Sequence, residues 1–270
     1  MLQPPRLGFL AAIMALSVVP AHAGDGHDVI ERARSRNGFA TWSDRTSEVT
    51  MESFQDGGRV TREATIRERT TPAGDHQALI DFTAPNDQRG TRMLHVAPRG
   101  APDDYWIWTP AARRARHIGG NAASSRQREE IFFGNDMSYR DLEMLTRILQ
   151  WDARAATATV VEGPCGDATC HQVTLVPTGT NEFPFGRYGL WFTRDDLLLR
   201  RVELFDRGGA LLETITCEGY FSQGGIQTPR TYTIEHVPTT SRAVITIRSV
   251  TYDSGLEADI FSVSNLERGS

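Results

Sequence analysis

The feature of this sequence that most constrains its fold is a series of short segments in which apolar and polar residues alternate, separated by turn residues. In the segment 47–54, Val49 and Met51 fall on one side, and Thr50 and Glu52 fall on the other. This alternation is typical of β-strands with one buried face, because successive side chains of a strand point to opposite faces. The predicted strands are 47–54, 59–70, 76–82, 92–97, 105–109, 113–118, 157–162, 171–176, 188–194, 197–205, 211–221, 230–236 and 242–252.

About a dozen antiparallel strands in simple up-and-down order indicate a mainly β protein built on a single sheet. A sheet of this length cannot stay flat, so we expect it to curl into a full or partial barrel. A closed barrel fills its interior with side chains, whereas a larger or open one can hold a ligand, and periodicity does not choose between them. No linker or change in composition divides the chain, so we expect one domain over residues 24–270.

Two segments have helical patterns. Residues 28–36 predict an N-terminal helix, and residues 138–150 predict an inserted helix whose start carries Ser138 and Asp141 at capping-box spacing. The inserted helix would place Leu142, Leu145 and Leu149 on one face, with Met137 and Tyr139 near its start. We expect it to form a lid over the interior of the curved sheet. The alternative is an ordinary core helix with no space beneath it.

The N-terminus is typical of a secretory signal peptide over residues 1–23. Arg6 precedes the apolar run 7–19, and Ala21-His22-Ala23 supplies small residues at the cleavage site. The apolar run is short for a membrane span, although a retained anchor is the alternative interpretation. No cysteine follows the site for lipid attachment. We therefore expect export to a bacterial periplasm and no transmembrane segment in the mature chain.

Composition and motifs argue against several function classes. The net charge is −5 at pH 7 and no basic run offsets it, so we expect no nucleic-acid partner. The nucleophile elbow, the zinc-protease motif and the phosphate-binding loop are all missing from the sequence. The acidic pairs at 103–104 and 195–196 fall at predicted turns. We predict no enzyme, and expect no catalytic residue, metal or cofactor, although a site assembled from distant residues would escape this reading.

The sequence contains three cysteines, Cys165, Cys170 and Cys217. Turn residues separate the first two, and export permits disulfides, so we predict that Cys165 and Cys170 form a local bridge. Cys217 would then be a buried free thiol beside Ile215. A metal site formed with His171 is disfavoured, because the spacing of the two cysteines differs from that of usual metal motifs.

The segment 105–110 is the most aromatic part of the chain. Trp106 and Trp108 share one face of the predicted strand, and Tyr105 and Ile107 share the other. The strand is either a central strand buried on both faces or one whose aromatic face lines a ligand cavity. Arginines of the next strand could be solvated or could bind a lipid phosphate or carboxylate. The residues predicted to face the concave side are Met51, Ile66, Phe82, Leu94 and Trp106 or Trp108.

Several blocks of the sequence resemble the LolA-like outer-membrane lipoprotein-sorting proteins, and within them the lipoprotein-sorting-related periplasmic branch. These blocks are Phe82-Thr-Ala-Pro85, Arg89-Gly-Thr91, Trp106-Ile-Trp-Thr-Pro110, 113–118, Phe133-Gly-Asn-Asp-Met-Ser-Tyr-Arg-Asp-Leu142 and the tail 259–266. The block 133–142 is the most specific, although Asn135 stands where the family often has serine or threonine. The resemblance covers most of residues 28–266.

The resemblance implies an unclosed antiparallel β-barrel, lidded by helices, that encloses an apolar cavity as in LolA and LolB. It implies a periplasmic carrier or binding protein for a lipid, a lipoprotein acyl chain or another hydrophobic ligand, serving lipoprotein sorting or an inner-membrane RND-type lipid exporter. The second hypothesis is a regulatory or sensor module that binds a protein partner, as in RseB-like relatives. The candidate cavity residues are Met51, Ile66, Phe82, Leu94, Trp106, Trp108, Met137, Tyr139, Leu142 and Leu145.

Overall fold

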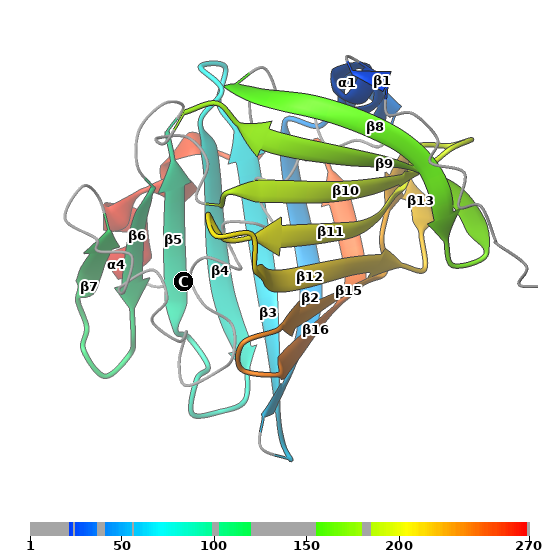
Figure 1. Cartoon of the computed structure of the whole chain (residues 1–270). Coiled ribbons are helices and arrows are strands. Elements are labelled where there is room, and N and C mark those ends of the chain that lie inside the picture. Colours follow the sequence, from blue (N-terminus) through cyan, green and yellow to red (C-terminus); the bar gives the residue numbers. More distant parts are fainter. Residues whose placement is uncertain are drawn as a thin grey trace, which may run out of the picture.

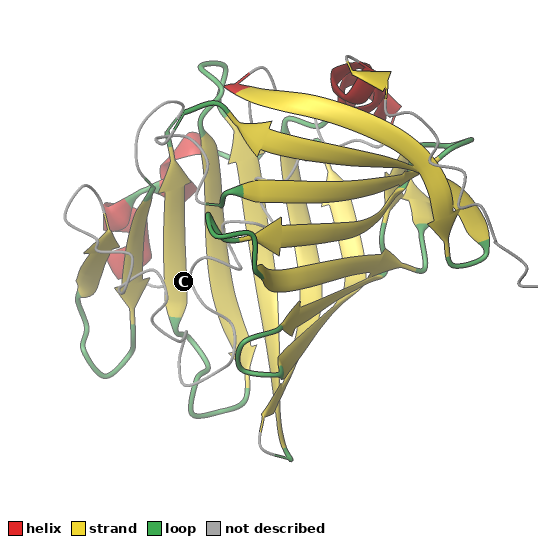
Figure 2. Ribbon diagram, in the orientation of Figure 1, coloured by secondary structure: helices red, strands yellow, loops and turns green. Residues whose placement is uncertain are grey.

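The computed structural model describes residues 22–23, 25–36, 41–55, 57–98, 103–119, 155–179 and 185–268. These residues form one large antiparallel sheet that curls without closing, which confirms the predicted class and the unclosed architecture (Figures 1 and 2). The helical elements are α1 (Asp25–Arg36), the 3₁₀-helix η3 (Ala258–Phe261) and α4 (Val263–Arg268). None of the helices in these ranges is long and apolar enough to cross a membrane.

The sheet contains fourteen strands in the order β1-β8-β9-β10-β11-β12-β15-β16-β2-β3-β4-β5-β6-β7. Their bounds are β1 (His22–Ala23), β2 (Asp44–Gln55), β3 (Gly58–Thr70), β4 (His76–Ala84), β5 (Arg92–Ala97), β6 (Asp104–Trp108), β7 (Ala115–Gly119), β8 (Ala156–Cys165), β9 (Ala168–Pro177), β10 (Arg187–Thr193), β11 (Leu199–Phe205), β12 (Leu211–Glu218), β15 (Thr231–His236) and β16 (Ser241–Tyr252). A separate short hairpin joins β13 (Phe221–Gln223) and β14 (Ile226–Thr228).

Pairing of β16 with β2 joins the two halves of the sheet. In Figure 1, strands β8 to β12 cross the front, while β2 and β3 run behind them and β4 and β5 stand to their left, so the sheet wraps around an interior. The edges are β1 and β7. Since β1 lies within residues 1–23, the expected signal-peptide cleavage would remove it and leave β8 at that edge.

The first hairpin fixes the register that later positions the cavity residues. Gln55 pairs with Gly58 at its tip, where the sequence predicts a turn. Gly57 has a φ of 77°, in the left-handed region that glycine adopts without steric cost. From this tip, β2 and β3 pair without a shift back to Asp44 and Arg69, so each side chain has a fixed cross-strand neighbour.

Helix α1 closes part of the interior and confirms the predicted N-terminal helix. Val29, Ile30 and Ala33 are buried on one face, as their spacing predicts. They pack toward β8 and β9 in the main core. Gly26 allows the close approach, since a Cβ there would lie 2.8 Å from the Cβ of Ala158.

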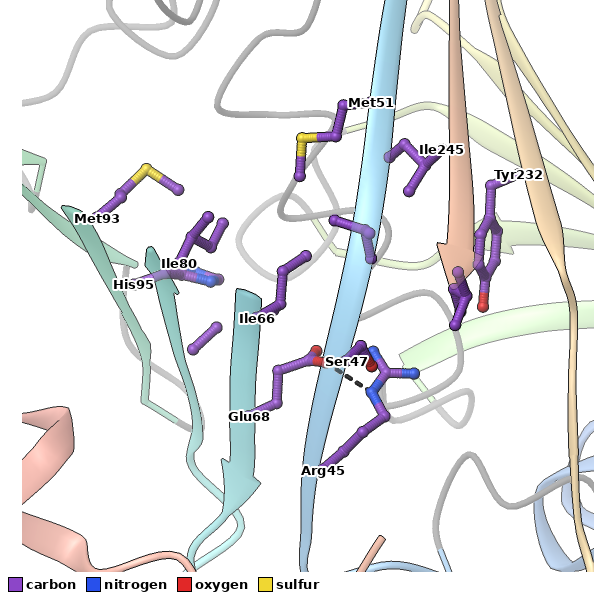
Figure 3. Close-up of a pocket in the computed structure, with 13 residues that line it drawn as sticks. Arg45, Ser47, Met51, Ile66, Glu68, Ile80, Met93, His95, Tyr232 and Ile245 are labelled. Atoms are coloured by element: carbon purple, nitrogen blue, oxygen red, sulfur yellow. Dashed lines mark hydrogen bonds and ion pairs between the residues drawn. The ribbon is translucent and has the colours of Figure 1, made fainter. Parts of the chain in front are cut away.

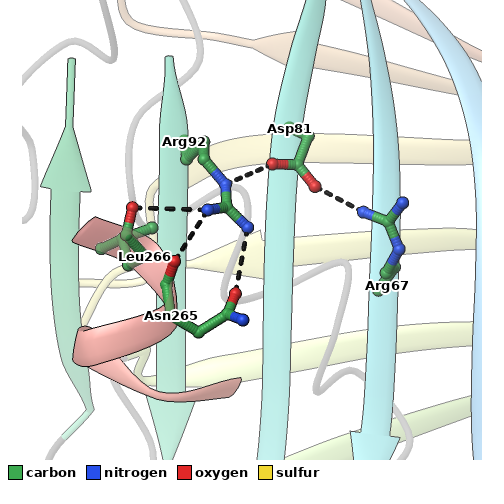
Figure 4. Close-up of polar contacts among 5 residues, drawn as sticks. All are labelled: Arg67, Asp81, Arg92, Asn265 and Leu266. Atoms are coloured by element: carbon green, nitrogen blue, oxygen red, sulfur yellow. Dashed lines mark hydrogen bonds and ion pairs between the residues drawn. The ribbon is translucent and has the colours of Figure 1, made fainter. Parts of the chain in front are cut away.

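The C-terminal elements η3 and α4 cover the convex face of the sheet beside β4 to β7. Phe261 and Leu266 are buried there against Leu79 and Leu94. Arg92 ties α4 to the sheet: its side chain donates to Asp81 at 2.6 Å and to the carbonyl oxygen of Asn265 at 2.9 Å (Figure 4). The sequence pattern gave no indication of this helical cover.

This cover corrects one sequence prediction. Leu94, Trp106 and Trp108 do not face the concave side; they pack in the convex cluster with Phe261 and Leu266. Tyr105 and Ile107 occupy the main core in their place. The strand is therefore packed on both faces, buried on the inner one and half-buried on the outer one, because short C-terminal helices shield its outer side.

The cysteine prediction is confirmed. Cys165 and Cys170 form a disulfide that closes the turn between β8 and β9, and Cys217 is a buried free thiol. Burial raises the pKa of the Cys217 thiol to about 12, so it stays protonated and unreactive in the folded protein. The predicted helix 138–150, with its proposed lid role, lies outside the described residues, as does nearly all of the segment 1–23.

Candidate functional site

The concave face contains a cavity between β2 to β5 and β15 to β16 (Figure 3). The cavity has a volume of about 60 Å³ and is open to solvent at its mouth. One water needs about 10–15 Å³ of such volume, so the cavity has room for several waters or a short alkyl segment. Its lining residues are Arg45, Ser47, Val49, Met51, Ile66, Glu68, Ala78, Ile80, Met93, His95, Tyr232, Ile245 and Ile247.

Strand register sorts these residues into cross-strand rows. One row is apolar except at its start: it begins at Ser47 on β2 and continues through Ile66, Ile80 and Met93 on the next three strands. It is called the apolar row below. Residues directly opposite each other on one face of antiparallel strands have their Cβ atoms about 4.5–5.5 Å apart. The side chains of Ile66, Ile80 and Met93 therefore form a continuous apolar wall, and all three are labelled in Figure 3.

The neighbouring polar row contains Arg45, Glu68 and His95, with Ala78 between the last two. Arg45 Nε donates to Glu68 Oε2 at 2.6 Å, and a second guanidinium nitrogen also contacts this oxygen. The Glu68 side chain is only 1% exposed and that of Arg45 is 18% exposed. The other Glu68 oxygen lies 3.5 Å from the ring of the buried His76. A charged pair thus borders an otherwise apolar wall.

The electrostatics of this pair keep both groups ionised. Burial, the largest single effect, would raise the pKa of Glu68, but the charges and hydrogen bonds of Arg45 and His76 together outweigh it and lower this pKa to about 2. Burial, the largest single effect, would lower the pKa of Arg45, but the attraction and hydrogen bond of Glu68, together with Tyr232 and Tyr252, outweigh it and raise this pKa above its usual range. The two formal charges cancel, so the pair is neutral as a unit.

His95 continues the polar row on β5. Its Nε2 lies 2.8 Å from Asp103 Oδ2, and both side chains are buried. The His95 ring also stacks on Tyr105, with ring centroids 4.5 Å apart and an angle of 3° between the planes. The imidazole is therefore held rigidly by an acid on one side and an aromatic ring on another.

The Ser47 hydroxyl differs from its neighbours. Ser47 is 2% exposed and lines the cavity. Within the described part of the chain, its Oγ has no hydrogen-bond partner. Buried hydroxyls are normally paired, and leaving one unpaired costs about 1–3 kcal/mol. Such a group is a preformed attachment point for a polar atom that enters the cavity.

The predicted cavity residues have mixed outcomes. Met51 and Ile66 line the cavity, and Phe82 belongs to the same core on the concave side of β4. Leu94, Trp106 and Trp108 lie on the convex face, as described above. Met137, Tyr139, Leu142 and Leu145 lie outside the described residues.

Sequence reasoning missed the polar lining residues Arg45, Ser47, Glu68, His95 and Tyr232. The signal was present for two of them. Arg45, Ser47, Val49 and Met51 alternate along β2 at a spacing of two residues, so all four side chains share its inward side. A buried arginine needs an acidic or hydrogen-bonding partner, so an arginine at an inward strand position predicts a polar partner on a neighbouring strand.

Comparisons with known proteins identify the fold. A family model with the description "Uncharacterized protein" matches residues 74–268. A solved domain from Vibrio parahaemolyticus named for outer membrane lipoprotein sorting is 21% identical, with a TM-score of 0.76, covering 92% of this chain and all of that one. A DUF1329 family protein from Desulfovibrio piger is 24% identical, with a TM-score of 0.76, covering 89% of this chain and 98% of that one.

A LolA superfamily protein from Nitrosomonas europaea is more distant in sequence, at 14% identity, but has a TM-score of 0.64 and covers 88% of this chain and 97% of its own. No curated protein matches the sequence. Because all three structural matches are below 25% identity, they show a shared fold and leave the ligand open.

Proposed function

This chain belongs to the family whose model matches residues 74–268 and has a LolA-like fold, and from that premise we propose that it binds and carries an apolar ligand. The ligand class is a lipid, a lipoprotein acyl chain or another hydrophobic molecule. The observation that carries the proposal is the apolar wall of Ile66, Ile80 and Met93 inside an open curved sheet. Each methylene that leaves water for such a wall contributes about 0.8 kcal/mol.

The proposed compartment is the bacterial periplasm. The disulfide between Cys165 and Cys170 supports it, because such bonds persist in oxidising compartments. The signal-peptide pattern of residues 1–23 supports export. Exchange of the ligand with an inner-membrane RND-type exporter is part of the same proposal, supported by the sequence resemblance.

The proposal is tested by filling the cavity. Ile66→Trp adds bulk to the apolar wall, so we expect binding of the uncharged fluorescent probe N-phenyl-1-naphthylamine to weaken about tenfold or more. The matched control is Thr65→Trp, one residue away on the opposite face of β3. It should leave the fluorescence titration unchanged.

Circular dichroism of both variants establishes that the sheet is retained. Equal probe binding by Ile66→Trp and Thr65→Trp, with both folded, would show that the cavity is not the binding site. Absence of probe and lipid binding in the wild-type protein would favour the alternative of a module that recognises a protein partner.

A further inference from the structure

The cavity is amphipathic in a way that the proposed function does not require. A site for acyl chains alone needs only the apolar wall. Here the wall of Ile66, Ile80 and Met93 adjoins the polar row of Arg45, Glu68 and His95. Ser47 belongs to the apolar row by register and lies next to Arg45 on the same face of β2. The polar row and the apolar row are therefore direct neighbours on the concave face.

Within the part of the chain that the structure describes, the hydroxyl of Ser47 lacks a hydrogen bond that a polar atom of a ligand could supply. Ser47 is only 2% exposed, and its Oγ has no hydrogen-bond partner among the described residues. An alanine in its place would avoid the desolvation cost of the hydroxyl. A polar atom that accepts from or donates to Oγ would offset that cost, and a purely hydrocarbon ligand would not.

The charges around Ser47 select the kind of polar group. Arg45 is already paired with Glu68. A ligand carboxylate or phosphate would therefore be buried beside the negative charge of Glu68, and the guanidinium that could balance the ligand's charge is already engaged. A ligand ammonium would in turn lie beside the guanidinium of Arg45. An uncharged hydroxyl or carbonyl meets neither penalty and can still hydrogen-bond to Ser47.

We propose that Ser47 binds the uncharged hydroxyl or ester head of a single-chain amphiphile whose alkyl chain lies along Ile66, Ile80 and Met93. This inference rests on the proposed function and deepens it, because it names the class of head group. The small size of the enclosed space is compatible with one chain, whose remainder extends through the open mouth.

The test compares three probes with the same twelve-carbon chain and different heads: monolauroylglycerol (uncharged), laurate (anionic) and dodecyltrimethylammonium (cationic). Each displaces N-phenyl-1-naphthylamine below its micelle concentration, at about pH 8 where laurate is ionised. We expect monolauroylglycerol to bind about tenfold tighter than either charged probe.

Ser47→Ala supplies the sharper result. It should weaken monolauroylglycerol about fivefold to tenfold, leave the charged probes and the fluorescent probe nearly unchanged, and raise the melting temperature of the ligand-free protein by a few degrees. A residue with a purely structural role would lower that temperature. Ser53→Ala is the matched control, since Ser53 is buried on the same face of β2 but does not line the cavity. It should leave the preference intact.

The outcomes separate the two proposals. Equal binding of all three heads, or an unchanged preference in Ser47→Ala, would overturn the head-group assignment while the carrier function stands. A failure of the wild-type protein to bind any probe, including N-phenyl-1-naphthylamine, would overturn the proposed function together with this inference.

Discussion

Replacing Glu68 by glutamine is expected to lower the free energy of unfolding by about 3 kcal/mol or more, because it leaves the guanidinium of Arg45 buried without a countercharge. The substitution keeps the shape of the side chain and removes its charge. Urea unfolding followed by circular dichroism measures the effect. The matched control is Glu63→Gln on the opposite face of β3, where the ion pair to Arg248 is 40% exposed on both sides. It should cost less than about 1 kcal/mol.

The same substitution has a signature in acid. The pKa of Glu68 in the folded protein is lowered from its ordinary value of 4.5 to about 2. A lowered folded pKa contributes stability that is fully present above about pH 4.5 and is lost as the pH falls toward 2. Glu68→Gln should therefore flatten the loss of stability in this window, and Glu63→Gln should retain it. Identical acid profiles for both variants would contradict the buried pair.

Ending the chain after Leu256, which removes η3 and α4, is expected to cost about 5 kcal/mol or more. Burying Phe261 and Leu266 is worth about 1.5–3 kcal/mol for each side chain, and Arg92 also loses its carbonyl partner at Asn265. Since whole domains are stable by about 5–15 kcal/mol, this is a large fraction of the total. Removal would also expose the convex patch that contains Trp106 and Trp108.

Urea unfolding measures the loss of stability in the truncated protein, and binding of an apolar dye measures the exposure of its convex patch. The matched control ends the chain after Arg268 and should behave as the full-length protein. If the long truncation does not fold, Phe261→Ala is the milder variant, with an expected cost of about 3–5 kcal/mol. Full stability without new dye binding in either case would show that the C-terminal elements are not part of the packed structure.

The strands could be predicted well because each sheet face imposes its own period-2 pattern on the sequence. The same logic failed for Trp106 and Trp108. Their strand is apolar on both faces, so alternation identified two faces without telling which one is concave. The deciding element is the pair of short helices between Ala258 and Arg268, and segments of four and six residues carry too little periodicity to be recognised.

The polar end of the site could be predicted in part. Counting ten residues back from Gln55 and ten forward from Gly58 at the first hairpin places Arg45 opposite Glu68. A predicted turn therefore contains enough information to find the buried pair. The position of His95 depends on two further strand pairings, and that of Tyr232 depends on the pairing of β16 with β2, whose register shifts between Ile247 and Ser249. One irregularity shifts the register of everything beyond it, so local patterns cannot supply these contacts.

The central claim, that the concave cavity carries an apolar ligand, is tested most directly by native mass spectrometry of protein purified from cells without detergent. We predict a mass above that of the chain by one lipid-sized ligand, recovered by organic extraction, retained in Thr65→Trp and lost in Ile66→Trp. Any wild-type protein recovered empty should gain the mass of one monolauroylglycerol molecule after incubation with that lipid. A folded wild-type protein that carries no lipid and remains at the mass of the bare chain after that incubation would contradict the claim.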